Sequence, residues 1–84
     1  MPTPIQEYME LAQFGLTAEN KRRPNAESLK MVSLDKGGTE PGLDSTTFVF
    51  YITVFSTRHG KATYLERVVE GIGGRYLESF TQVW

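Results

Sequence analysis

The polar residues near the start of the chain constrain its fold more than any other feature of the sequence. They follow one another at steps of four, three, four and three residues: Gln6, Glu10, Gln13, Thr17 and Asn20. At about 100° per residue, this spacing stacks them into one stripe along a helix. The remaining positions are mostly apolar over about 200° of the circumference, whereas an ordinary surface helix hides a stripe of roughly 100°. We therefore predict a helix that the rest of the fold wraps around.

The ends of this helix are marked by residues that favour helix termini. Thr3 is a suitable N-cap, Pro4 falls at the first helical position, and Gln6 completes a capping box with Thr3. Basic residues at positions 21–23 favour the negative pole of a helix, and Pro24 cannot continue it. The sequence thus predicts one helix over residues 3–23.

The rest of the chain has the composition of β-strands. Residues 46–57 alternate regularly, with Phe48, Phe50, Ile52 and Val54 on one face, and predict a central strand. Further strands are predicted over 26–35, 61–70 and 75–84, separated by polar or glycine-rich loops at 36–45, 58–60 and 71–74. The predicted fold class is α+β, a single domain over residues 1–84 in which a curved four-stranded antiparallel sheet wraps the N-terminal helix.

Two details of this layout concern the first strand and the loops. The alternation slips between Met31 and Val32, which indicates a β-bulge or a strand buried on both faces. In a meander alternate connections share one end of the sheet, so the loops at 36–45 and 71–74 should lie side by side. The start of the helix can lie near them, and the three segments together would form one surface for another molecule.

Composition excludes several classes of function. The chain has no cysteine, so it has no disulfide framework and no cysteine-based zinc site. Nine basic and ten acidic residues are interspersed, which gives no footprint for nucleic acid or an acidic membrane. We find no apolar run near 18 residues and no signal-peptide pattern, so we expect a soluble protein, and the cellular compartment is not indicated.

No constellation of ionisable residues predicts catalysis. His59 is the only histidine and is expected to be a solvated turn residue. A catalytic pair among the glutamates is conceivable, but a solvated face is the favoured interpretation of Glu7, Glu10, Glu66 and Glu78. The paired glycines do not stand between a strand and a helix N-terminus, so we interpret them as turns rather than as a phosphate cradle. We therefore predict no enzyme, no catalytic residue, no metal and no cofactor.

Outward-facing aromatic residues leave two interpretations open. Tyr51, Phe55 and Tyr64 or its neighbours could expose apolar area on the convex face of the sheet, which would be unusual in a monomer. They could equally form cross-strand pairs within the sheet.

Several segments resemble the plant cystatins. The run Leu11-Ala12-Gln13-Phe14-Gly15-Leu16, followed by Asn20-Lys21, is similar to the helix signature Leu-Ala-Arg-Phe-Ala-Val-x-x-x-Asn-Lys of that family. Residues 30–34, 50–54, 64–69 and 76–80 are similar in order and spacing to its four strands, so the resemblance covers nearly the whole chain. It implies the cystatin fold and inhibition of papain-like cysteine proteases by occlusion of the active-site cleft.

The resemblance also implies three protease-contacting segments, and each departs from the family pattern. The N-terminal tail holds Pro2, Thr3 and Pro4 and lacks the family's glycine. The first loop has no Gln-x-Val-x-Gly motif, and its contacting residues would be Gly37, Gly38, Thr39, Glu40, Pro41 and Gly42. The second loop has no Pro-Trp, and its contacting residues would be Ile72, Gly73 and Gly74. Because glycine-rich loops offer little apolar area and cost entropy to order, we expect weak inhibition.

Two further expectations concern partners. A cystatin-like module that kept the scaffold and lost its inhibitory wedge would bind or regulate another protein instead of a papain-like protease. A homodimer could form by exchange of the helix and first strand, with the long glycine-containing loop at 36–45 as the hinge.

Overall fold

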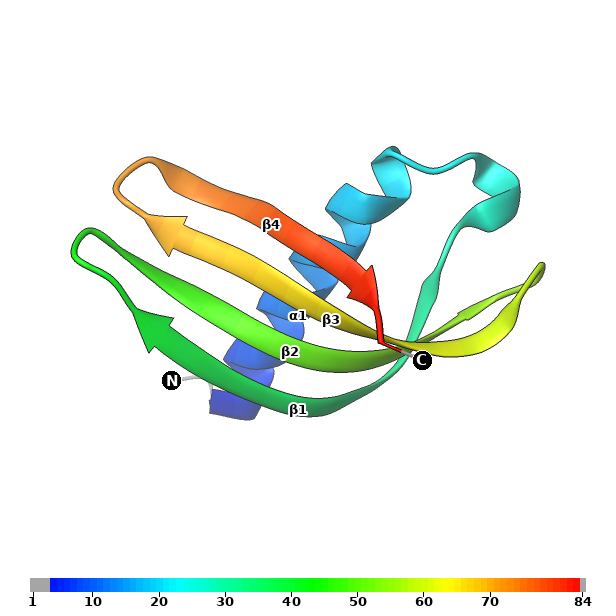
Figure 1. Ribbon diagram of the computed structural model, residues 1–84, viewed down its shortest axis with the longest axis horizontal. Coiled ribbons are helices and arrows are strands. Elements are labelled where there is room, and N and C mark those ends of the chain that lie inside the picture. Colours follow the sequence, from blue (N-terminus) through cyan, green and yellow to red (C-terminus); the bar gives the residue numbers. More distant parts are fainter. Residues whose placement is uncertain (1–3, 84) are drawn as a thin grey trace.

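The structure is a computed structural model and describes residues 4–83. Helix α1 (Pro4–Lys21) is followed by a 3-10 turn (Asn25–Glu27) and by four strands, β1 (Lys30–Pro41), β2 (Ser45–Ser56), β3 (Gly60–Gly71) and β4 (Gly74–Gln82). The strands pair antiparallel in the order β1-β2-β3-β4, as Figure 1 shows. The predicted α+β class and the meander are therefore confirmed. The N-cap that we predicted at Thr3 lies outside the described residues.

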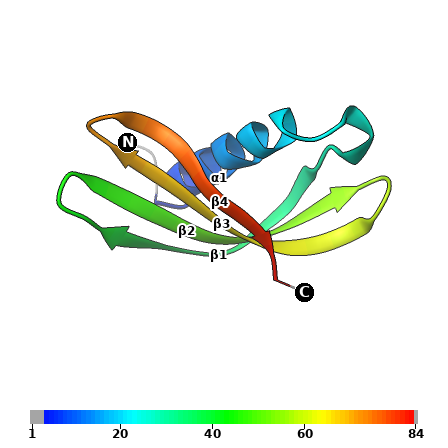
Figure 2. The ribbon, with the colours of Figure 1, turned by 45° about the horizontal axis from the view of Figure 1, so that its top comes forward.

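Helix α1 lies across the concave face of the sheet (Figure 2). Its buried positions are Leu11, Ala12, Gly15, Leu16 and Glu19, which recur at helical spacing and form one stripe. Full burial of each leucine side chain contributes roughly 1.5–3 kcal/mol. The sequence had suggested a helix surrounded over most of its circumference, and this was wrong at the N-terminal end.

The sheet covers α1 from one side only. Ile5 is 72% exposed and Met9 is also exposed, because the first turns of the helix extend past the side chains that cover the centre. Four residues of the predicted polar stripe, Gln6, Glu10, Gln13 and Thr17, are exposed as expected. The fifth is half-buried, because the Asn20 side chain hydrogen-bonds the backbone of Leu29 in both directions, at 2.9 Å and 2.8 Å.

The core lies between α1 and the inner faces of β2 and β3. Phe48, Phe50, Ile52 and Val54 are buried on one face of β2, as their alternation predicted. The ring of Tyr8 packs edge-on against Phe48 and Phe50, with centroid distances of 6.1 Å and 5.5 Å. These contacts anchor the N-terminal half of the helix on the sheet.

Strand β1 differs most from the sequence prediction. It begins at Lys30 rather than at 26 and continues to Pro41, so that only residues 42–44 connect it to β2. Gly37 and Gly38 pair with Phe50 and Val49. The ladder with a strongly β-forming partner outweighs the poor strand propensity of glycine. The long loop expected at 36–45 was therefore wrong, and a hinge in this region would have to open at the short turn 42–44.

The predicted irregularity in β1 is confirmed. The register shifts between Met31 and Ser33, which leaves Val32 as an extra residue, and shifts again between Leu34 and Lys36. A third shift between Arg67 and Val68 marks the pairing of β3 with β4. Such bulges increase the local twist of a strand, and they accompany the curvature of the sheet toward α1.

Candidate functional site

The connections β1–β2 and β3–β4 lie at the same end of the sheet, as the meander predicted (Figure 1). They are also joined, because the backbone N–H of Ile72 donates to the carbonyl of Asp44 over 3.4 Å. The first turn is closed by the N–H of Gly42, which donates to the carbonyl of Ser45 over 2.7 Å. We call residues 42–44 and 71–74 together the tip edge.

The close approach of the two turns depends on Gly71. A Cβ atom at this position would lie 2.6 Å from the carbonyl oxygen of Asp44 and 2.8 Å from Cβ of Ser45. Both distances are shorter than van der Waals contacts allow, so a larger residue would push the turns apart. The glycine therefore sets the spacing of the tip edge.

The tip edge exposes two large aliphatic side chains. Leu43 is fully exposed in the first turn, and Ile72 is 88% exposed in the second. Beside them an open cavity of about 230 Å³ is lined by residues that include Asp44, Val69 and Tyr76. Two exposed aliphatic side chains on neighbouring turns therefore give this edge an apolar surface.

The structure divides the predicted contact residues into two groups. Gly42, Ile72, Gly73 and Gly74 belong to the tip edge. The other five, Gly37, Gly38, Thr39, Glu40 and Pro41, are paired residues of β1 and do not form a loop. Their placement in a contacting loop was therefore wrong.

The predicted N-terminal segment is described only in part. Pro2 and Thr3 lie outside the described residues, and Pro4 is the first residue of α1. The helix begins in the half of the molecule that carries the tip edge (Figures 1 and 2).

Leu43 is the residue of this edge that the sequence prediction missed. It stands between Gly42 and Asp44, in a segment that otherwise consists of turn-forming residues. A large aliphatic side chain at such a position has no core to enter and must face water. A large aliphatic residue within a turn segment was therefore the signal that could have identified Leu43.

The outer face of the sheet carries an ion-pair cluster. Arg67 on β3 donates from Nη2 to Oε1 of Glu40 on β1 at 2.8 Å, and from Nε to Oε1 of Glu78 on β4 at 2.9 Å. The hydrogen bond from Arg67 lowers the pKa of Glu40 below its usual range. All three side chains are at least partly solvated, so the cluster ties strands together rather than forming a reactive carboxylate pair.

Glu66 was expected on a solvated face, and that was wrong. Its side chain is fully buried because β3 turns positions 64, 66 and 68 toward the helix. Neither carboxyl oxygen has a hydrogen-bond partner among the described residues, and burial raises the pKa of Glu66 to about 8. The group is therefore mostly protonated at neutral pH.

The remaining ionisable residues lie where the sequence predicted. Glu7 and Glu10 are exposed on α1, and His59 is exposed in the turn between β2 and β3. Within residues 4–83, no three histidine, aspartate or glutamate side chains gather as metal ligands would. No helix in this part of the chain has the length and apolar character needed to cross a membrane.

The aromatic residues that we discussed as outward-facing do not share one environment. Tyr51 and Phe55 lie on the outer face of β2, and Phe55 is 40% exposed. Tyr64 instead faces the helix, is buried, and stacks on Phe80 at a centroid distance of 4.6 Å. The outward placement of Tyr64 was therefore wrong, although it does pair with an aromatic ring of the neighbouring strand.

Comparison of the chain with protein-family models, with curated proteins and with solved structures returned no match.

Proposed function

We propose that this protein has a cystatin-like fold and inhibits a papain-like cysteine protease by inserting the tip edge into the active-site cleft. The proposal rests on one observation above all. Two neighbouring turns, tied by the hydrogen bond from Ile72 to Asp44, each present an uncovered aliphatic side chain at the same end of the sheet.

The geometry supports occlusion of a cleft rather than binding to a flat surface. Both turns are short, and the paired strands behind them hold the backbone in place. A preorganised edge loses little conformational entropy on binding, which favours affinity. Leu43 and Ile72 would provide the apolar contacts with the walls of the cleft.

The same features predict weak inhibition. Two aliphatic side chains bury far less area than a standard protein interface, and neither turn carries an aromatic anchor. We expect an inhibition constant on the order of micromolar.

Titration against papain with a fluorogenic peptide substrate tests the proposal. We expect competitive inhibition that weakens about tenfold, equivalent to ~1.4 kcal/mol, in each of the variants Leu43→Glu and Ile72→Glu. Val32→Glu is the matched control, because Val32 is also an exposed aliphatic residue but lies in a bulge of β1 far from the turns. Full papain activity at a large molar excess of the protein would overturn the proposal.

A second candidate function is a protein-interaction module without inhibitory activity. It is favoured by the outer face of the sheet, which no other described element covers (Figure 2). Phe55 is exposed there, and Val49, Tyr51 and Leu65 are half-buried. These side chains form an apolar band of the kind that partner proteins cover.

The two candidates make opposite predictions for the same variants. A partner bound through the outer face would be lost on Phe55→Glu and retained by Leu43→Glu and Ile72→Glu. Competitive inhibition of papain by the unsubstituted protein would count against the second candidate, because that candidate has no inhibitory activity.

A further inference from the structure

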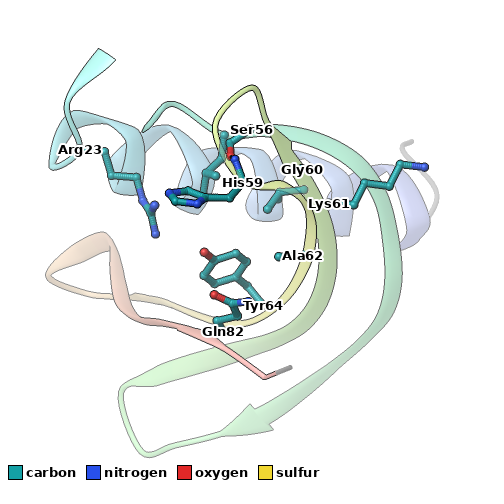
Figure 3. Close-up of a pocket in the computed structure, with 10 residues that line it drawn as sticks. Arg23, Ser56, His59, Gly60, Lys61, Ala62, Tyr64 and Gln82 are labelled. Atoms are coloured by element: carbon teal, nitrogen blue, oxygen red, sulfur yellow. The ribbon is translucent and has the colours of Figure 1, made fainter. Parts of the chain in front are cut away.

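A second cavity lies at the opposite end of the strands from the tip edge. It has a volume of about 340 Å³ and opens between the segment after α1, the β2–β3 hairpin and the end of β4. Figure 3 shows the side chains of Arg23, His59, Tyr64 and Gln82 around it. This volume lies in the range of small-molecule sites.

Arg23 provides a fixed positive charge at this cavity. Its Nε donates to Oε2 of Glu19 at 2.8 Å, and Glu19 is itself buried at the end of α1. The guanidinium carbon lies 5.7 Å from the centroid of the Tyr64 ring. Nε is used in the hydrogen bond to Glu19, and the terminal nitrogens of the guanidinium group point toward Tyr64 and His59 (Figure 3).

His59 is held at the cavity by its own backbone. The N–H of His59 donates to Oγ of Ser56 at 2.9 Å, and Ser56 is almost completely buried. The imidazole points toward the Arg23 side (Figure 3), and its Nε2 lies 3.9 Å from Oε1 of Glu27. The hydrogen bond uses only backbone and Ser56 atoms, and the distance from Nε2 to Glu27 is longer than a hydrogen bond, so neither contact engages the ring in a hydrogen bond.

The lining combines these polar groups with an apolar floor. Leu29, Val54 and Ala62 contribute the apolar part, and Tyr64 presents an aromatic ring. Among the described residues that line the cavity, none is acidic. Glu19 pairs with Arg23 and Glu27 lies near His59, and neither glutamate lines the cavity.

We propose that this cavity binds a small organic carboxylate with a flat apolar body. The planar guanidinium of Arg23 matches the geometry of a carboxylate, and His59 can donate a further hydrogen bond. The apolar body would lie against Ala62 and the ring of Tyr64. An inorganic anion would meet the same donors but leave the apolar floor in contact with water.

Benzoate is a suitable probe of this site. Titration of the isotope-labelled protein, followed by amide chemical shifts, should give saturable shifts at residues around Arg23, His59 and Ala62 with a dissociation constant of about 1 mM. Benzamide keeps the ring and removes the charge, and inorganic phosphate keeps a charge and removes the ring. We expect both to bind at least about fivefold more weakly than benzoate, a difference of ~1 kcal/mol.

Three substitutions separate direct contact from general electrostatics. Arg23→Gln and His59→Gln should each weaken benzoate binding about fivefold or more, ~1 kcal/mol. Lys61→Gln removes the same charge from a lining residue whose ammonium group points away from the cavity (Figure 3), and should change binding less than twofold, under ~0.5 kcal/mol. Each amide spectrum also reports whether the variant is folded, and His59→Gln leaves the pairing of Glu19 intact.

Several results would overturn the proposal. Absence of saturable shifts at this end of the sheet would do so, as would equal binding of benzamide or phosphate. An equal loss of binding in Lys61→Gln and Arg23→Gln would show that only the overall charge matters. None of these results depends on inhibition of a protease. The proposed carboxylate site is therefore tested independently of the proposed function of the tip edge.

Discussion

The carboxyl group of Glu66 packs against the backbone of Gly15, at the point where α1 crosses β3. A Cβ atom at position 15 would lie 2.7 Å from Cδ of Glu66 and 2.9 Å from Cγ2 of Val68. The missing side chain of the glycine therefore provides the space that the buried carboxyl occupies. The arrangement places an ionisable group without a hydrogen-bond partner among the described residues in the centre of a small core.

Glu66 should make the stability of the protein fall with rising pH. Its pKa is raised from 4.5 to about 8 in the folded chain, so between these values the unfolded chain releases a proton that the folded chain retains. The free energy of unfolding should decrease through this window by at most about 1.4 kcal/mol per pH unit. Below the window both states are protonated, and above it both are ionised, so the contribution of Glu66 is then constant.

Urea unfolding of the wild type and of Glu66→Gln across this window measures the effect. The difference between the two proteins isolates Glu66 from the other carboxyl groups, including Asp35 and Glu40, whose pKa values are lowered and whose contributions have the opposite sign. Glu7→Gln, at an exposed position of α1, is the matched control. Parallel pH profiles of the wild type and Glu66→Gln would contradict the prediction.

Gly15→Ala should destabilise the fold. The added methyl group has to displace the Glu66 carboxyl and the Val68 side chain, and overpacking of this kind costs about 1–3 kcal/mol. In a Glu66→Ala background the cost of Gly15→Ala should be smaller, because the carboxyl is no longer in the way. A double-mutant cycle by chemical denaturation measures this coupling, and strict additivity of the two changes would contradict it.

Asn20→Ala should destabilise the protein by about 1–3 kcal/mol. The side chain makes both hydrogen bonds that tie the end of α1 to the backbone of Leu29, and their loss leaves the partly buried N–H of Leu29 without this acceptor. Gln13→Ala is the control, because the Gln13 side chain bonds only an exposed residue of its own helix, Thr17, at 3.3 Å. Thermal unfolding should separate the two variants clearly, and equal midpoints would contradict the role of Asn20.

Arg67→Gln should cost little stability, because its ion pairs with Glu40 and Glu78 are solvent-exposed. The effect should shrink at high salt, where exposed charges are screened. Urea unfolding at low and high ionic strength tests this. A larger loss of stability that does not change with salt would contradict this prediction. It would mean that packing of the aliphatic part of the Arg67 side chain, rather than its charge, holds the strands together.

Exchange of α1 and β1 between two copies stays a prediction, now with the short turn at 42–44 as the segment that would open. Short connections favour this exchange, because extending them joins two strands into one. We expect a dimer fraction that grows with protein concentration in size-exclusion chromatography. Insertion of two glycines after Leu43 should relax the turn and reduce that fraction, and a monomer at all concentrations would contradict the prediction.

The sequence predicted the features that depend on regular alternation. The strand at 46–57 and the polar stripe of α1 both follow from repeated spacing. The strand is found at 45–56, and four of the five stripe residues are exposed. The bulge at Val32 was also visible as a break in the alternation. These patterns are local, so no knowledge of the tertiary structure was needed.

The errors arose where a partner element decides the outcome. Gly37 and Gly38 look like a turn in isolation, but β2 provides a long ladder that draws them into β1. Glu66 was assigned to a solvated face by its charge, although its position between Tyr64 and Val68 places it on the inner face of β3. The cavity beside Arg23 could not be predicted, because it brings together residues more than fifty positions apart.

The tip edge and the cavity beside Arg23 lie at opposite ends of strands that each contain 12 residues, in a molecule whose longest dimension is 39 Å. A molecule bound at one end of the strands therefore leaves the other end accessible to solvent. The paired β-strands separate the two ends, so side chains at one end can be substituted or labelled without changing those at the other.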